Sequence, residues 1–231
     1  MSHAFKCKVG GLVVQRHDEV VDQLGQLCTQ ALTKSSVHAE PIISKGCIEE
    51  QNKDLKAQKD KRTTTTTSNN QKSPTAPKEL RGDLIIRGLW EKGTDCIVDV
   101  RVTDTDQPSY KSKYTPFQVL EMHEDEKKKK YAKKCYEIRK TFSPFVTSAD
   151  GMIGKEAKEI LKNISIRLAD KWDIPYSRVR RYVNAKMSIA IIRAAHRCLR
   201  CSRIPTTKIT RTELGERPWD DGAGLGLFTT H

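Results

Sequence analysis

Two apolar segments decide the fold of this chain: Arg81-Gly82-Asp83-Leu84-Ile85-Ile86 and, after a short turn, Cys96-Ile97-Val98-Asp99-Val100-Arg101-Val102. Each has the composition of a β-strand, yet each carries an aspartate where a strand ordinarily has valine or isoleucine. A buried carboxylate costs free energy unless something binds it. A divalent metal ion is the obvious binder, so the pair of strands predicts a metal site on a sheet.

The geometry of a hairpin brings the two acids together. Side chains alternate between faces along a strand, so Asp99 and Arg101 point the same way. A turn centred near Lys92 places Asp83 opposite Arg101 and Ile85 opposite Asp99, and diagonal side chains lie roughly 7 to 8 Å apart. Asp83 and Asp99 are then expected to hold one Mg²⁺ or Mn²⁺, with Arg101 binding phosphate. A slip of one residue would separate the acids. Alternatively, Asp83 begins an edge strand and Asp99 forms a surface ion pair with Arg101.

Composition indicates a polyanionic partner. Only 36% of the 231 residues are hydrophobic and 6% are aromatic, which suggests that part of the chain does not pack. The formal charge of +13 favours nucleic acid first and an anionic membrane surface second. The excess of positive charge is concentrated toward the C-terminal end, because residues 174–212 contain no acidic residue.

Seven cysteines, an odd number spread from Cys7 to Cys201, do not form the pattern of a secreted disulfide framework. The first residues lack the apolar core of a signal peptide, and no apolar run approaches the length of a membrane span. We therefore expect an intracellular protein of the nucleus or cytoplasm, neither secreted nor bound to a membrane.

Periodicity predicts nine segments along the chain, including the two strands already described. They are a helix over 18–33 with Asp18 as its N-cap, a short strand over 39–43, strands over 83–90 and 95–103, a loop over 104–116, a helix over 117–136, a strand over 142–147, and helices over 155–172 and 177–199. Mixed elements in this order predict an α/β fold with a small central mixed sheet flanked by helices.

The predicted organisation has five parts. They are residues 1–48 with the first helix and strand, a disordered low-complexity insertion over 49–79 containing five consecutive threonines, a core over 80–150, a C-terminal helical pair over 151–204 that forms a basic extension, and a flexible tail over 205–231.

Three separated motifs together resemble the restriction-enzyme-like endonuclease domain of non-LTR retrotransposons, a member of the PD-(D/E)xK nuclease superfamily. They are Arg-Gly-Asp-Leu, then Asp-Val-Arg-Val, then Lys127-Lys128-Lys129-Lys130-Tyr131 on a helix. Arg16-His17-Asp18-Glu19 is similar to a segment upstream of the site in those elements, although His17 by itself more simply packs or caps the helix start. The resemblance covers about residues 3–47 and 80–205.

The resemblance implies a restriction-endonuclease-like core and a function in cutting DNA at the site of element insertion. It implies catalytic roles for Asp83, Asp99, Arg101, Lys127 and Tyr131, with Asp83 and Asp99 as ligands of Mg²⁺ or Mn²⁺. Two residues depart from the family pattern. Gly82 replaces a proline, and Arg101 replaces the usual lysine. Arginine keeps its proton, so Arg101 can stabilise phosphate charge but cannot act as a base.

Further basic residues are candidates for nucleic-acid binding. One of them is Lys130, three positions after Lys127. The others are Arg193, Arg197 and Arg200, which share one face of a helix. This face either binds the phosphates of a nucleic acid or only makes the helix soluble. His3-x-x-x-Cys7 resembles half of a zinc knuckle, but two ligands do not make a structural zinc site. Cys198-x-x-Cys201 with His196 is an equally weak zinc motif.

The sequence thus favours a metal-dependent DNA endonuclease domain of a retroelement, with DNA and the RNA of the element as candidate partners and no small-molecule cofactor. Two alternatives stay open. One is a nucleic-acid-binding module without catalysis, and the other is a decayed retroelement fragment.

Overall fold

The computed structural model describes residues 11–44 and 79–201. The predicted insertion up to residue 78, the predicted tail and the His3–Cys7 pair lie outside these ranges. The helices are α2 (Leu12–Ala31), the short 3₁₀ turn η2 (Lys34–Ser36), α4 (Pro108–Lys111), α5 (Pro116–Glu137), α6 (Lys155–Trp172) and α7 (Tyr176–Cys201). The strands are β1 (Val37–Ala39), β2 (Ile42–Ser44), β3 (Leu80–Arg81), β4 (Leu84–Arg87), β5 (Asp95–Thr103) and β6 (Thr141–Ser148).

The central sheet has four strands in the order β1-β4-β5-β6. Strand β4 is antiparallel to both β1 and β5, whereas β6 runs parallel to β5 after the crossover through α5. Pro144 is tolerated in β6 because this strand lies at the edge of the sheet. Strands β2 and β3 form a separate antiparallel pair. The expected mixed α/β fold with a small mixed sheet flanked by helices is confirmed.

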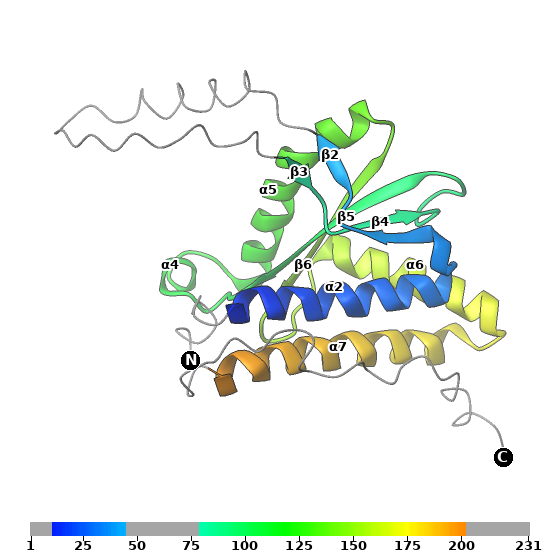
Figure 1. The fold of residues 1–231 in the computed structure, drawn as a ribbon. Coiled ribbons are helices and arrows are strands. Elements are labelled where there is room, and N and C mark those ends of the chain that lie inside the picture. The colour runs from blue at the N-terminus through cyan, green and yellow to red at the C-terminus, as the bar shows by residue number, and fades with distance from the viewer. Residues whose placement is uncertain (1–10, 45–78, 202–231) are drawn as a thin grey trace, which may run out of the picture.

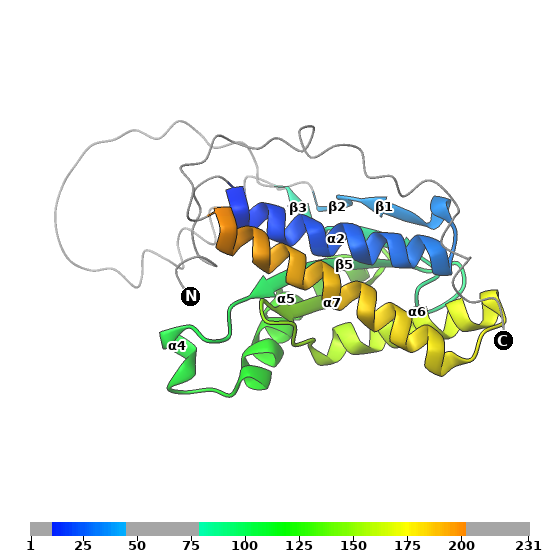
Figure 2. The same ribbon diagram turned by 90° about the horizontal axis from the view of Figure 1, so that it is seen from below.

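Helices cover both faces of the sheet (Figure 1). Val98 and Val100 of β5 point into the main core, which they share with α2, α6 and α7. Ile97 points to the other face, where it meets Tyr131 and Cys135 of α5. Figure 2, seen from below, shows α2 and α7 running side by side beneath the sheet. The pair over 151–204 is therefore not an extension, as the sequence suggested, because both of its helices complete the main core.

Tertiary contacts move several element boundaries away from the expected ones. Helix α2 begins at Leu12, six residues before the expected N-cap, because Leu12 is buried against α7 and its carbonyl accepts a hydrogen bond from the Cys198 thiol (3.6 Å). Asp18 consequently lies inside the helix. The expected strand over 39–43 is divided at Glu40, whose φ is 50°. The chain turns there from its pairing with β4 to its pairing with β3.

Helices α5 and α6 are stabilised at their N-termini in different ways. Thr115 and Gln118 form a reciprocal capping box at the start of α5. Helix α6 follows Gly154, which has no side chain, and its cap comes from another helix. The buried carboxylate of Glu124 on α5 accepts a hydrogen bond from the Glu156 backbone N–H (3.0 Å). Burial raises the pKa of Glu124, and this hydrogen bond partly opposes the rise.

Replacing Glu124 with alanine is expected to lower the free energy of unfolding by about 1 kcal/mol, because the α6 N-terminus loses its only side-chain acceptor among the described residues. Urea unfolding followed by circular dichroism measures the loss. Asp125→Ala removes the exposed acid next to Glu124 and serves as the matched control. Equal stabilities of the two variants would contradict this capping role.

The four described cysteines other than Cys201, namely Cys28, Cys96, Cys135 and Cys198, are buried free thiols. Burial is the largest cause that raises the pKa of Cys135 to about 11. Within the described ranges no helix is both long and apolar enough to cross a membrane.

Candidate functional site

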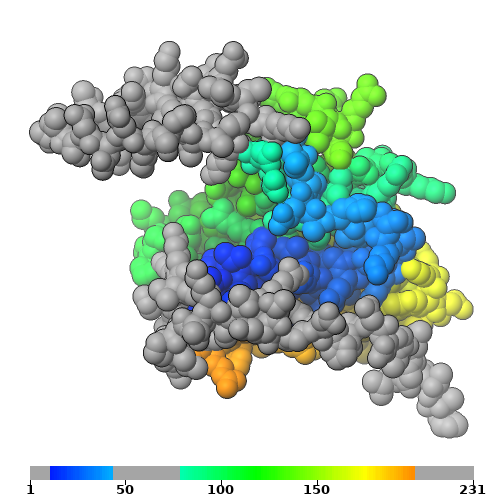
Figure 3. Space-filling model, in the orientation of Figure 1, coloured from blue at the N-terminus to red at the C-terminus, as the bar shows by residue number. Residues whose placement is uncertain are grey.

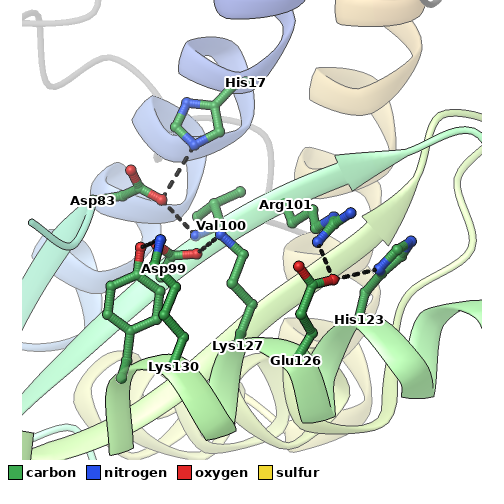
Figure 4. A network of polar contacts seen from close by, with 10 residues as sticks. His17, Asp83, Asp99, Val100, Arg101, His123, Glu126, Lys127 and Lys130 are labelled. Carbon is green, nitrogen blue, oxygen red and sulfur yellow. Dashed lines mark hydrogen bonds and ion pairs between the residues drawn. The ribbon is translucent and has the colours of Figure 1, made fainter. Parts of the chain in front are cut away.

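The two acids singled out by the sequence lie on the face of the sheet covered by α5 (Figure 4). Asp99 lies in the middle of β5 with its side chain only 6% exposed. Asp83 lies between β3 and β4 and is 23% exposed. The negative charge of Asp83 contributes to raising the pKa of Asp99, although burial is the larger cause. The two carboxylates are therefore close enough to repel each other, as expected for a pair that shares one site.

The hairpin register differs from the expected one by two residues. Leu84 pairs with Val98 and Ile85 with Ile97, so the turn is centred on Glu91 and not on Lys92. Asp83 is thus displaced along the strand from the expected partner Arg101 toward Asp99. Because the register is shifted by an even number of residues, each side chain stays on its expected face of the sheet, and both acids remain on the same face.

Asp83 ends the pairing of β4 with β5. Its backbone N–H donates to Val98 O (3.1 Å), and its Oδ2 accepts the next N–H along β5, that of Val100 (2.5 Å). The carboxylate therefore takes the position that a backbone carbonyl would hold in a continuing ladder. This hydrogen bond fixes Asp83 beside Asp99.

Gly82 has a local steric role just before Asp83. A Cβ atom at this position would come 2.5 Å from the Ile97 side chain. The Gly82 N–H also donates to Pro41 O (3.0 Å). A proline here would lose this hydrogen bond and crowd Ile97. Glycine at this position is thus consistent with the local packing.

His17 was expected to pack or to cap the helix start, but it lies inside α2 and belongs to the site. Its Nε2 donates to Asp83 Oδ2 (3.2 Å) and its Nδ1 donates to Asp18 Oδ1 (3.2 Å), which requires the doubly protonated ring. Burial opposes this charge, but the hydrogen bond and charge of Asp83, followed by those of Asp18, raise the pKa of His17 to about 9. The Arg16-His17-Asp18 segment noted in the resemblance was the one signal in the sequence that could have identified it.

Lys127 and Tyr131 of α5 meet Asp99 from the opposite side. Lys127 Nζ forms an ion pair with Asp99 Oδ2, and Lys127 is 18% exposed. Tyr131 lies four residues later on the same helical face and stacks on Phe142 with ring centroids 5.1 Å apart. Burial and then the charge of Asp99 raise the pKa of Tyr131. Lys130 donates to the Tyr131 hydroxyl (2.9 Å) and lies 4.5 Å from the centre of its ring.

Arg101 shares the face of Asp99 but is held by a different partner. Its Nη1 donates to Glu126 Oε2 (2.7 Å), and the same oxygen is 3.2 Å from His123 Nδ1. Burial, with the charge of Arg101 adding to it, lowers the pKa of His123. Lys127, and not Arg101, is therefore the cation that pairs with Asp99.

The three arginines expected to follow phosphates do not join this site. Arg193, Arg197 and Arg200 lie on α7, which packs on the other face of the sheet from α5. Arg193 and Arg200 are exposed, but Arg197 Nη1 binds the buried carboxylate of Glu19 (2.9 Å). Arg197 thus has a structural partner within the α2–α7 packing.

The acid pair has the chemistry of a magnesium site. Mg²⁺ is commonly held by one or two carboxylates together with waters and substrate phosphates. Asp83 and Asp99 supply two such groups, and their mutual repulsion is the kind that a cation relieves. In the described part of the chain no cluster of three or more His, Cys, Asp or Glu side chains is arranged to hold a metal ion. The zinc motif at His196 and Cys198 therefore finds no support there.

Comparisons with known proteins add no relative: no family model matches the chain, and no curated protein matches it.

Proposed function

We propose that this chain is a metal-dependent DNA endonuclease domain that nicks target DNA, with a restriction-endonuclease-like core of the kind found in non-LTR retrotransposons. One observation carries the proposal. Asp83, Asp99, Lys127 and Tyr131, which come from three separate segments, meet on one face of the sheet. Two carboxylates on one face of a sheet, one of them paired with a lysine, have the chemistry needed to cleave a phosphodiester. The positive charge of the chain suits a DNA partner, in the nucleus or the cytoplasm.

Each residue has a distinct part in the proposed reaction. Asp83 and Asp99 would hold Mg²⁺ or Mn²⁺, which when bound activates water and neutralises charge on the phosphate. Lys127 neutralises Asp99 in the free protein and stabilises phosphate charge when substrate is bound. Tyr131 anchors α5 against Phe142 and so positions Lys127. Arg101 contributes charge after leaving Glu126, and it takes no part in proton transfer.

A second candidate function is a nucleic-acid-binding module without catalysis. The observation that favours it is that both acids already have cationic partners without a metal, His17 for Asp83 and Lys127 for Asp99. A protein that has lost its metal would keep the fold and the basic surface in this form. A decayed retroelement fragment that retains neither cutting nor binding is the third possibility.

Nicking of supercoiled plasmid in Mg²⁺ or Mn²⁺ tests the proposal. The wild type is expected to convert the supercoiled form to the open circle, and Asp83→Asn and Asp99→Asn are expected to lose this activity. Asp170→Asn, which alters an exposed acid on α6, is the matched control and is expected to nick normally. DNA binding without metal-dependent nicking would favour the non-catalytic module. A wild-type protein that neither nicks nor binds DNA would contradict the endonuclease and the non-catalytic binding module alike.

A further inference from the structure

One exposed stripe of α5 lies outside the acid site. Lys129, Lys133 and Tyr136 are spaced at i, i+4 and i+7, so they share one face of the helix. All three are exposed, and Tyr136, at 83%, is the most exposed of the large apolar side chains in the described part of the chain. Figure 3 shows the C-terminal turns of α5, in light green, projecting at the top of the molecule.

The charge around Tyr136 is strongly positive. Residues 127–140 contain eight lysines and arginines and a single acid, Glu137. Three of these cations are neutralised by carboxylates, because Lys127, Lys128 and Lys140 form ion pairs. Lys129, Lys133 and Arg139 are instead exposed to solvent. The ring therefore lies among cations that are available to an anionic ligand.

Another exposed aromatic on the same helix lacks this environment. Phe117 is 62% exposed at the N-terminal end of α5. Lys158 from α6 lies 5.4 Å from the centre of its ring, and its neighbour one turn later is the acidic Glu121. The combination of a bare ring with cations one and two turns away is thus a property of Tyr136 and does not follow from exposure alone.

The stripe is separate from the acid site. Tyr136 is nine positions after Lys127, which corresponds to about two and a half turns and places the two residues on opposite faces of α5. A ligand on the stripe does not have to displace any residue around Asp99. Lys129 and Tyr136 are about 10 Å apart along the axis, which is the length of about three nucleotides in a stacked strand.

We propose that this stripe binds single-stranded nucleic acid, with an unpaired base stacked on Tyr136 and backbone phosphates on Lys129 and Lys133. Lysines alone would fit any polyanion, but a bare aromatic ring selects a ligand that offers the face of a base. In a duplex those faces are stacked inside, so only an unpaired base can reach the ring. The inference rests on the proposed nucleic-acid function and specifies the form of polymer bound on the face of α5 that points away from the acid site.

Binding of the full chain to fluorescein-labelled 20-mers tests the proposal by fluorescence anisotropy in EDTA. The probes are a DNA strand, an RNA strand and the DNA duplex of the same sequence. Tyr136→Ala is expected to weaken binding of a single strand about tenfold and duplex binding less than twofold. Tyr136→Phe, which keeps the ring, and the control Phe117→Ala are expected to bind as the wild type does. If the DNA strand binds more tightly than the RNA strand, DNA is the ligand, and the reverse order identifies RNA.

The lysines are tested by the dependence of binding on salt. The double variant Lys129→Gln, Lys133→Gln is expected to bind a single strand with a weaker dependence on salt. The slope of the logarithm of the binding constant against the logarithm of the salt concentration should fall in magnitude by about 1.4. An unchanged slope, or equal losses on strand and duplex in Tyr136→Ala, would overturn the proposal. These measurements need neither metal nor cutting. A protein that fails to nick but binds strands through Tyr136 therefore contradicts only the endonuclease function.

Discussion

Replacing Lys127 with methionine is expected to lower the free energy of unfolding by about 3 kcal/mol. Lys127 is the ion-pair partner of Asp99, whose side chain is only 6% exposed. Removing the lysine leaves the buried carboxylate of Asp99 without its cation and next to a second carboxylate, Asp83, whose own cationic partner is His17. The pKa of Asp99, already raised by burial, is expected to rise further. Urea unfolding at neutral pH without divalent metal measures the change.

A neighbouring lysine provides the matched control. Lys128 also forms an ion pair, with Glu156 (2.6 Å), but both partners are far more exposed, at 42% and 31%. Lys128→Met is therefore expected to cost less than about 1 kcal/mol.

A double-mutant cycle separates loss of the pair from loss of packing. Asp99→Asn removes the charge that Lys127 neutralises, so Lys127→Met should cost much less in that background. Equal costs in the two backgrounds would show that Lys127 acts through its aliphatic chain and not through Asp99.

The fold was largely predictable from local sequence patterns. Strand β5 and helix α6 were placed with their observed bounds, because their apolar residues alternate or recur at helical spacing along the whole element. The start of α2 was not predictable in this way. It depends on Leu12 packing against Cys198, which is far away in the sequence. Strand β1 likewise depends on its pairing with β4.

Local sequence patterns singled out the acids of the site, whereas Lys127 was named only through the resemblance and the partners of the cations were not predicted. A carboxylate in an apolar strand stands out locally, which is why Asp83 and Asp99 could be identified. Long side chains choose their partners in space, and no sequence pattern linked Arg101 with Glu126 or Arg197 with Glu19. The assignment of Arg101 and Lys127 to their acids therefore required the packing of α5 against β5.

The stability of the protein is expected to fall as the pH rises from about 6.5 to about 9, because His17 loses its proton over this range. The pKa of His17 is raised from 6.5 to about 9 by the carboxylates of Asp83 and Asp18, against the effect of burial. A raised pKa means that the folded state binds the proton more tightly than the unfolded chain does. The stabilisation is complete below pH 6.5 and is lost as the pH passes through about 9. We expect roughly 2 kcal/mol, allowing for solvent screening of this partly exposed pair.

The comparison of wild type with His17→Gln isolates this contribution. Other groups also titrate, and Asp99 in particular has a raised pKa with an effect of its own on the pH dependence. The difference in unfolding free energy between the two proteins removes such shared contributions. It is expected to be largest near pH 6, measured by urea unfolding in EDTA, and to shrink toward zero above pH 9. His38→Gln, at an exposed histidine of β1, is the control and should leave the pH profile unchanged. A difference that stays constant from pH 6 to pH 9.5 would mean that His17 stabilises the site by packing and not by its charge on Asp83.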